Sequence, residues 1–187
     1  MMDPINREYA TWLRAELDAR FGVPVRYVVY SHSHWDHGSG GEVFAATAEF
    51  VGHENMTAAL MVREGVALPE NAVAMDANRN RTIKLSEANW NFQNNFALFD
   101  SNADGMLSGG EIARGPVSDV DPPTETYSDR KTITLGGKTV EMIHPGTQYA
   151  ADMSVIYFPE ENAAFVVDFL NVGMLPFQTM GGFNLEA

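Results

Sequence analysis

The feature that most constrains this chain is a short run, SHSHWDH at residues 31–37, which places three histidines and one aspartate within six positions. It follows an apolar segment, Val23 to Tyr30, of the kind that forms a buried strand. In an extended chain alternate side chains lie on the same side. His32, His34 and Asp36 are therefore expected to point into a single pocket.

The glycines after the run predict a sharp turn and a helix from about Gly41, which would bring His37 in from the N-terminal end of that helix. Imidazole nitrogen and carboxylate oxygen are ligands that suit zinc and neighbouring metals. Four such groups are too many for one open catalytic zinc, so the pattern favours two adjacent metals that share a hydroxide. The alternative is a solvated histidine-rich loop, which the density of ligands makes the weaker interpretation.

Composition narrows the class of protein. The 187 residues are 45% hydrophobic, with a net charge of −13 and no cysteine. One soluble domain with a sizeable core is expected, without a disulfide or thiolate metal site. The negative charge argues against nucleic acid or an anionic membrane surface as a partner. The first 20 residues show no signal peptide, and no apolar run reaches the length of a membrane span.

The N-terminal segment predicts a helix. Asp3-Pro4 is interpreted as an N-cap followed by proline in the first turn, and Gly22 as the stop. An apolar stripe expected to face the core recurs between them at helical spacing: Ile5, Tyr9, Trp12, Leu13, Leu17 and Phe21. A strand near Glu49 to Gly52 and a helix from Asn55 to Arg63 should follow.

The middle of the chain carries a second motif. Residues 100–111, DSNADGMLSGGE, match the pattern D-x-[DN]-x-[DN]-G-x5-E of an EF-hand calcium loop. In that loop Gly105 permits the sharp turn, and oxygen ligands come from positions 1, 3, 5, 7, 9 and 12. These positions are Asp100, Asn102, Asp104, Met106 (through its carbonyl), Ser108 and Glu111.

The flanking residues agree with this interpretation. An aromatic helix from about Ser86 should precede the loop, and Gly115-Pro116 should end the exit helix at about Arg114. An Asp/Asn/Gly-rich turn is the alternative. The sequence motif occurs once, so we expect a structural calcium site in an EF-hand-like insertion, residues 86–114, and not a calcium sensor.

From Pro122 onward the pattern returns to strands. Residues 131–143 predict a hairpin with a tight turn at Gly136-Gly137, and residues 153–167 predict a second hairpin. Asp168 ends the last apolar strand, where a carboxylate is unfavourable unless it is paired or binds a metal.

Taken together, these segments resemble the metallo-β-lactamase superfamily. The residues that carry the resemblance are YSHSHWDHGSGGEVF (30–44), GHEN (52–55), LGGKTVEMIHPG (135–146) and SVIYFPEENAAFVVDFL (154–170). It covers about residues 4–64 and 123–185. It implies one metal held by His32 and His34, and a second held by Asp36, His37 and a bridging Asp168. His53 is not a ligand in the family and is expected to be structural.

The chain departs from the family pattern at the next ligand. Aligned without gaps on H-P-G-P-A-H-T-x-G-D from His144, the ligand histidine falls on Tyr149. Either Tyr149 ligates weakly, or His144 substitutes in a displaced loop. No histidine follows His144, so the last family ligand is also missing from this sequence.

These observations predict an α/β fold: a single domain, residues 1–187, with a metallo-β-lactamase-like sheet core, flanking helices and incomplete ends. They indicate a zinc-dependent hydrolase with Asp36 orienting the attacking hydroxide, acting on a small-molecule substrate. The alternative is a degenerate, calcium-stabilised binding or interaction protein. Missing strands would leave a sheet edge open, which favours a homo-oligomer.

Overall fold

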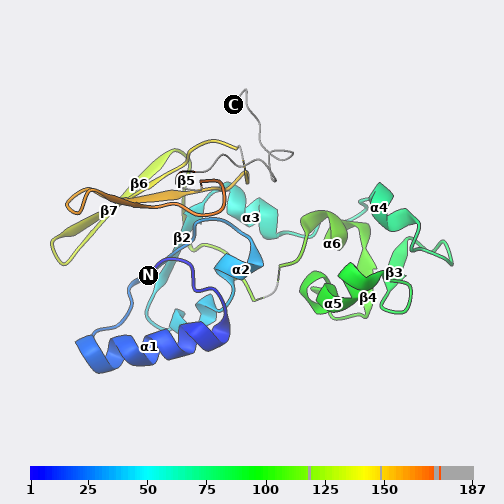
Figure 1. Cartoon of the computed structure of the whole chain (residues 1–187), viewed down its shortest axis with the longest axis horizontal. Coiled ribbons are helices and arrows are strands. Elements are labelled where there is room, and N and C mark those ends of the chain that lie inside the picture. The colour runs from blue at the N-terminus through cyan, green and yellow to red at the C-terminus, as the bar shows by residue number, and fades with distance from the viewer. Residues whose placement is uncertain (118, 148, 171–172, 174–187) are drawn as a thin grey trace.

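The structure is a computed structural model that describes residues 1–117, 119–147, 149–170 and 173. It has two lobes, which Figure 1 shows side by side with α1 and the larger sheets in one and α4, α5 and α6 in the other. The C-terminal end of the stretch that resembles the metallo-β-lactamase superfamily, residues 174–185, lies outside the described residues.

The first lobe contains two β-sheets. A parallel sheet has the order β1-β2-β5, formed by Tyr27–Val29, Glu49–His53 and Glu125–Tyr127. An antiparallel sheet has the order β6-β7-β8-β9, formed by Arg130–Leu135, Lys138–Ile143, Val155–Phe158 and Ala163–Phe165. The two predicted hairpins are thus confirmed, and both glycines of the first turn have positive φ. The cluster of Val29, Val51, Tyr127, Met142 and Ile156 joins the two sheets in one core.

The helices of this lobe are α1 (Arg7–Phe21), α2 (Trp35–Gly38), the 3-10 helix η1 (Gly41–Phe44) and α3 (Asn55–Leu60). Helix α1 packs against η1, and Ala10 is its one fully buried residue. Gly22 ends α1 in the left-handed conformation, as predicted.

Two predictions about α1 were wrong. The N-cap is Asn6, whose side chain accepts a hydrogen bond from the backbone of Tyr9, and Asp3 is instead buried. The aromatic stripe is not core-facing, since Trp12 is 56% exposed and its ring lies tilted against that of Tyr9 at the surface. The helix buries a small residue, Ala10, in a cluster with Val28, Tyr30 and Phe44, and the bulky rings lie outside.

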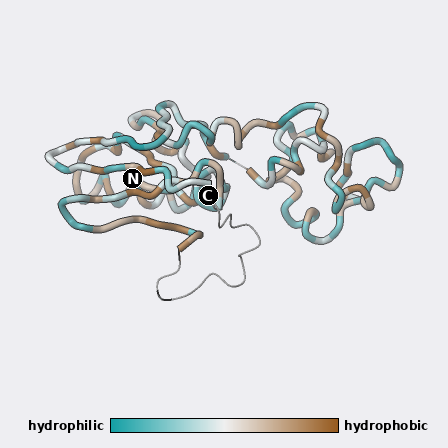
Figure 2. Tube along the Cα trace, turned by 90° about the horizontal axis from the view of Figure 1, so that it is seen from above, coloured by the Kyte–Doolittle hydropathy of each residue, from teal (hydrophilic) through white to brown (hydrophobic). Residues whose placement is uncertain are grey.

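The second lobe comprises α4 (Glu70–Val73), β3 (Thr82–Lys84), α5 (Trp90–Phe99), β4 (Met106–Ser108) and α6 (Gly109–Arg114). Strands β3 and β4 form an antiparallel ribbon. The lobe has its own hydrophobic core, whose buried members are Ala72, Ile83, Ala88, Phe96, Leu107 and Ile112. Figure 2 shows this lobe set apart from the sheets in a second view.

The predicted aromatic helix and its short exit helix are both present in the second lobe. The lobe extends further toward the N-terminus than the predicted insertion, because α4 and β3 pack into the same core. Among the described residues, no helix is long and apolar enough to cross a membrane.

Candidate metal centre

The histidine loop begins at the C-terminal end of β1 in the parallel sheet. Strand β1 ends at Val29, and the chain stays extended as far as His34, which caps α2. Asp36 and His37 then lie on α2 and not on an extended chain or before a helix at Gly41, so the predicted local geometry was wrong for both residues. The reason is local: the backbone N–H groups of His37 and Gly38 both bond to the carbonyl oxygen of His34 and close a helical turn.

His32 is the most deeply buried histidine of the loop, with no exposed surface. Its Nδ1 lies 2.9 Å from the hydroxyl oxygen of Ser31. Its Nε2 lies 3.2 Å from Oδ2 of Asp168 but lacks a hydrogen bond of acceptable geometry. Burial first, and then the neighbouring histidines, lower the pKa of His32 to about 3. The imidazole is therefore neutral and presents a lone pair.

His37 lies between two carboxylates. Its Nδ1 lies 3.1 Å from Oδ2 of Asp3, and its Nε2 lies 3.3 Å from Oδ2 of Asp168. The hydrogen bond to Asp3 raises the pKa of His37 above its ordinary value, against the effect of burial. Both histidines thus direct Nε2 at the same carboxylate oxygen.

Asp3 supports the whole loop and is the residue that the sequence analysis missed. Its side chain is 1% exposed and accepts hydrogen bonds from the backbone N–H and the hydroxyl of Ser31, at 2.8 and 2.7 Å. Through Ser31 it fixes the ring of His32, and directly it fixes His37. A carboxylate behind a ligating histidine sets the ring tautomer and orientation. The only signal in the sequence was an acid in an apolar N-terminal segment.

Asp168 lies three residues beyond β9 and has a φ of 66°. The left-handed region is uncommon for a residue other than glycine, and strain of this kind is concentrated at functional sites. The conformation directs its carboxylate at His32 and His37.

Tyr149 lies beside the loop, as the gapless alignment implied. Its ring centroid is 5.7 Å from that of His32 and 5.6 Å from that of His34. Burial and the negative charge of Asp168, to which it is hydrogen-bonded, raise the pKa of its phenol to about 12. Asp36 lies at the edge of this group, with Oδ2 3.9 Å from Nε2 of His37 and its side chain 58% exposed.

His144 lies elsewhere. Its ring stacks on that of His53 at a centroid distance of 4.0 Å, and its Nδ1 bonds the carbonyl oxygen of Met153. His53 in turn bonds the carbonyl oxygen of Ser128. The two rings thus pack on each other, and each bonds a backbone carbonyl oxygen, as expected of structural histidines.

The grouped atoms fit a metal ion. Nε2 of His32, Nε2 of His37 and a carboxylate oxygen of Asp168 form a cluster of potential ligands within 4.8 Å of one another. Two ligand atoms on one tetrahedral zinc at about 2.1 Å lie about 3.4 Å apart. The two His–Asp separations of 3.2 and 3.3 Å match that spacing. An unsatisfied, neutral, buried Nε2 on His32 is the donor that such an ion requires.

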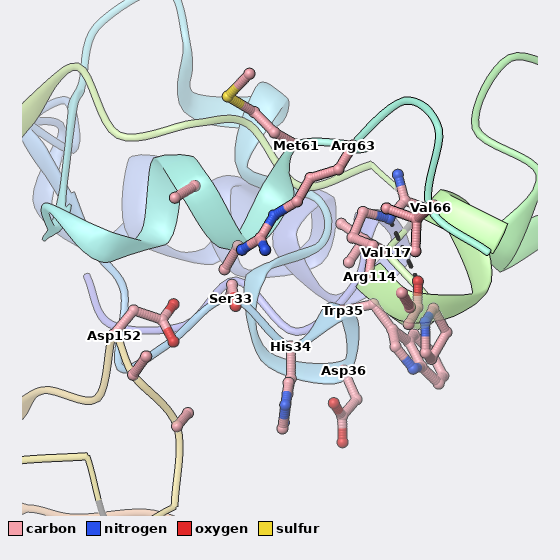
Figure 3. Close-up of a pocket in the computed structure, with 18 of the residues that line it drawn as sticks. Ser33, His34, Trp35, Asp36, Met61, Arg63, Val66, Arg114, Val117 and Asp152 are labelled. Atoms are coloured by element: carbon pink, nitrogen blue, oxygen red, sulfur yellow. Dashed lines mark hydrogen bonds between the residues drawn. The ribbon is translucent and has the colours of Figure 1, made fainter. Parts of the chain in front are cut away.

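A cleft of about 600 Å³ lies beside the centre and is lined by its neighbours His34, Asp36 and Tyr149. Figure 3 shows His34 and Asp36 projecting side by side from the loop, with Arg63 extending toward Ser33. Gly110, Ala113 and Arg114 of α6 also line this cleft, so the second lobe forms one wall.

The calcium-motif residues form a closed loop between α5 and α6. Asp100 accepts hydrogen bonds from the backbone N–H groups of Asp104 and Gly105. Glu111 is 2% exposed and accepts from the N–H and hydroxyl groups of Ser101 and Ser108. Burial raises the pKa of Glu111, but these hydrogen bonds outweigh it and leave that pKa below its ordinary value.

The chain is similar to solved structures of metallo-beta-lactamases and of a protein of that family. Metallo-beta-lactamase IND-7 has 15% identity and a TM-score of 0.50, covering 95% of this chain and 56% of its own. A metallo-beta-lactamase from Pontibacter korlensis has 17% identity and a TM-score of 0.49, covering 86% and 49%. A metallo-beta-lactamase family protein from Thermus thermophilus has 19% identity and a TM-score of 0.49, covering 94% and 52%.

The chain therefore spans about half the length of these solved structures. A search of curated protein sequences gives no match. The model of the Metallo-beta-lactamase superfamily matches residues 6–179, which is nearly the whole chain. On this match, and with a fold that agrees, the chain belongs to the metallo-β-lactamase superfamily.

Proposed function

We propose that the protein is a zinc-dependent hydrolase of this superfamily. The observation that carries the proposal is the convergence of His32, His37 and Asp168, with Nε2 of His32 buried, neutral and without a hydrogen bond. Their neighbours His34, Asp36 and Tyr149 line an adjacent cleft. His34 and Tyr149 complete the surroundings of His32. A zinc ion held there would lower the pKa of a bound water and polarise a carbonyl or phosphoryl oxygen.

The residues of the chain have separate tasks in this proposal. Asp3 and Ser31 hold the rings of His32 and His37, so that both Nε2 atoms remain directed at Asp168. Asp36, exposed at the mouth of the cleft beside His37, orients the attacking water and accepts its proton.

The walls of the cleft combine apolar and basic side chains. Trp35, Met61 and Val66 offer apolar contacts, and Arg63 and Arg114 bring positive charge to the same space. A small ester, lactone, lactam, thioester or phosphodiester would fit a space of this size and lining. Asp36 and Asp152 also line the cleft, so the charges of the two arginines are matched by two carboxylates.

The test begins with zinc. The chain is purified without a chelator, its zinc content is measured by elemental analysis, and hydrolysis of a nitrophenyl ester and of a chromogenic lactam is followed. His32→Ala should remove zinc and activity together, whereas His144→Ala, at a histidine outside the centre, should retain both. Activity that survives His32→Ala, or zinc that His144→Ala removes, would contradict the assignment.

A second function is favoured by one observation. Tyr149 lies beside His32 and His34, where the gapless alignment sets a histidine ligand, and its phenol, with a pKa of about 12, is protonated near neutral pH and hydrogen-bonded to Asp168. A protonated phenol is a poor zinc ligand. The alternative is therefore a catalytically degenerate member that binds a partner or ligand in the cleft. Zinc present without hydrolysis of either substrate would favour it.

We also infer a structural calcium site at residues 100–111. The support is the complete motif, together with the inward orientation of Asp100, Asn102, Asp104 and Glu111 around the loop. Because α6 follows this loop directly and lines the cleft, calcium here would also fix one cleft wall.

A further inference from the structure

In the second lobe, called the helical lobe below, another segment repeats the structure of the calcium-motif loop. Residues 76–87, DANRNRTIKLSE, begin 24 positions before residues 100–111, DSNADGMLSGGE. Both segments have oxygen-bearing side chains at positions 1, 3, 5 and 12. The first lacks the glycine at position 6, where it has Arg81, and a pattern that requires glycine does not detect it.

The two segments have the same internal hydrogen bonds. In each loop the side chain at position 1 accepts from the backbone N–H groups of positions 5 and 6, and position 3 accepts from position 5. Position 5 accepts from position 7, and the glutamate at position 12 accepts from position 9. All ten distances lie between 2.8 and 3.2 Å.

The backbone conformations also agree. Position 4 has a φ of 59° at Arg79 and 55° at Ala103, and position 6 has a φ of 68° at Arg81 and 78° at Gly105. A left-handed conformation is unfavourable for arginine. The first loop adopts it twice without a glycine, and the hydrogen bonds that its own side chains accept from the backbone offset this cost.

A contact between the two loops relates them as a pair. Strands β3 and β4 are positions 7–9 of the respective loops, and their antiparallel register sets Ile83 opposite Leu107. Both residues are at position 8, both are fully buried, and both belong to the core of the lobe. Positions 7–9 of one loop therefore pair with positions 7–9 of the other, and an approximate two-fold axis relates the two loops.

We propose that residues 76–87 form a second calcium site, so that the helical lobe binds two calcium ions; this rests on the calcium site proposed at residues 100–111. Its ligands are side-chain oxygens of Asp76, Asn78, Asn80 and Glu87 and the carbonyl oxygen of Thr82, the types and positions that an EF-hand loop uses. The first loop has two acids where the second has three, and it carries two arginines. It therefore binds calcium more weakly.

The experiment is a calorimetric titration of the zinc-saturated chain with calcium, in which zinc occupies the histidine centre. We expect two calcium ions per chain, the second with lower affinity. Glu87→Gln should leave one, and Glu111→Gln should remove the tighter one. Glu64→Gln, at an exposed glutamate outside both loops, is the matched control and should still bind two.

A gain of affinity gives a second test that does not depend on a destabilised variant. Asn80→Asp supplies the acid that position 5 of the other loop already has, with little change in shape. It should tighten the weaker site by about tenfold, because calcium affinity rises with the number of charged ligands. An unchanged weaker affinity in this variant would contradict the assignment.

The outcomes separate the two proposals. One calcium in the unmodified chain, removed by Glu111→Gln and retained in Glu87→Gln, would overturn the second site and leave the first. No calcium binding in the unmodified chain would overturn both.

Discussion

Removal of the charge on Asp3 is the perturbation that tests how the centre is organised. Asp3→Asn keeps the size of the side chain but replaces one accepting oxygen by an amide group that donates. The carboxylate receives three contacts, from the N–H and hydroxyl of Ser31 and from Nδ1 of His37. An amide can satisfy only part of this set, whichever way it is oriented.

The expected loss of zinc affinity in Asp3→Asn follows from the burial of these contacts. The side chains of Asp3 and His37 are 1% and 15% exposed, so water can replace little of what is lost. A hydrogen bond to a charged group contributes about 1.5–3 kcal/mol. Loss of the carboxylate behind a ligating histidine lowers metal affinity by about 10- to 100-fold, or about 1.4–2.7 kcal/mol. We expect zinc affinity to fall within this range.

The assay is competition for zinc with a chromophoric chelator, together with thermal unfolding of the metal-free chain. Asp18→Asn is the matched control, because that side chain is 59% exposed and lies 3.9 Å from Arg14. The control should change neither quantity. A folded Asp3→Asn chain whose zinc affinity stays within about twofold of the unmodified chain would refute the assignment of Asp3 as the positioning residue.

Three further predictions concern the ligands and the assembly. Tyr149→His should raise zinc affinity at least tenfold, since a neutral imidazole replaces a protonated phenol, and the same chelator competition measures it; unchanged affinity would place the ligand elsewhere. Calcium at 100-fold excess over its Kd should stabilise the fold by about 2.7 kcal/mol, seen as a higher unfolding midpoint, and Glu111→Gln should remove most of this response. Light scattering should give the mass of a dimer, because β5 and β6 are outer strands of the two sheets as described, whereas Met1 to Asp3 bond along β1; a monomer at high concentration would count against it.

From the sequence, the side chains that cluster at the candidate centre could be proposed, but the carboxylate that positions them could not. Ligand chemistry is a property of residue type, so His32, His37 and Asp168 could be proposed from their spacing and from the resemblance. Asp3 could not, because its contacts reach 28 and 34 positions along the chain and depend on the packing of the N-terminal segment beside β1. A cap motif next to a proline was the stronger local pattern, and tertiary contacts overrode it.

The helical lobe shows a different limit. The loop at residues 100–111 was visible because it keeps every position of its motif, including Gly105. Its counterpart was hidden because Arg81 replaces the glycine, although the conformation is the same. Side-chain hydrogen bonds within the loop, together with the shared burial of Ile83 and Leu107, hold the first loop in that shape.

The central claim is that this chain holds zinc through its histidine loop and Asp168. The most direct measurement is the zinc content per chain after purification without a chelator, with His32→Ala measured beside it. We predict at least one zinc per chain in the unmodified protein and less than a tenth of that in the variant. A zinc-free chain that also fails to take up added zinc, or equal zinc in both proteins, would contradict the account.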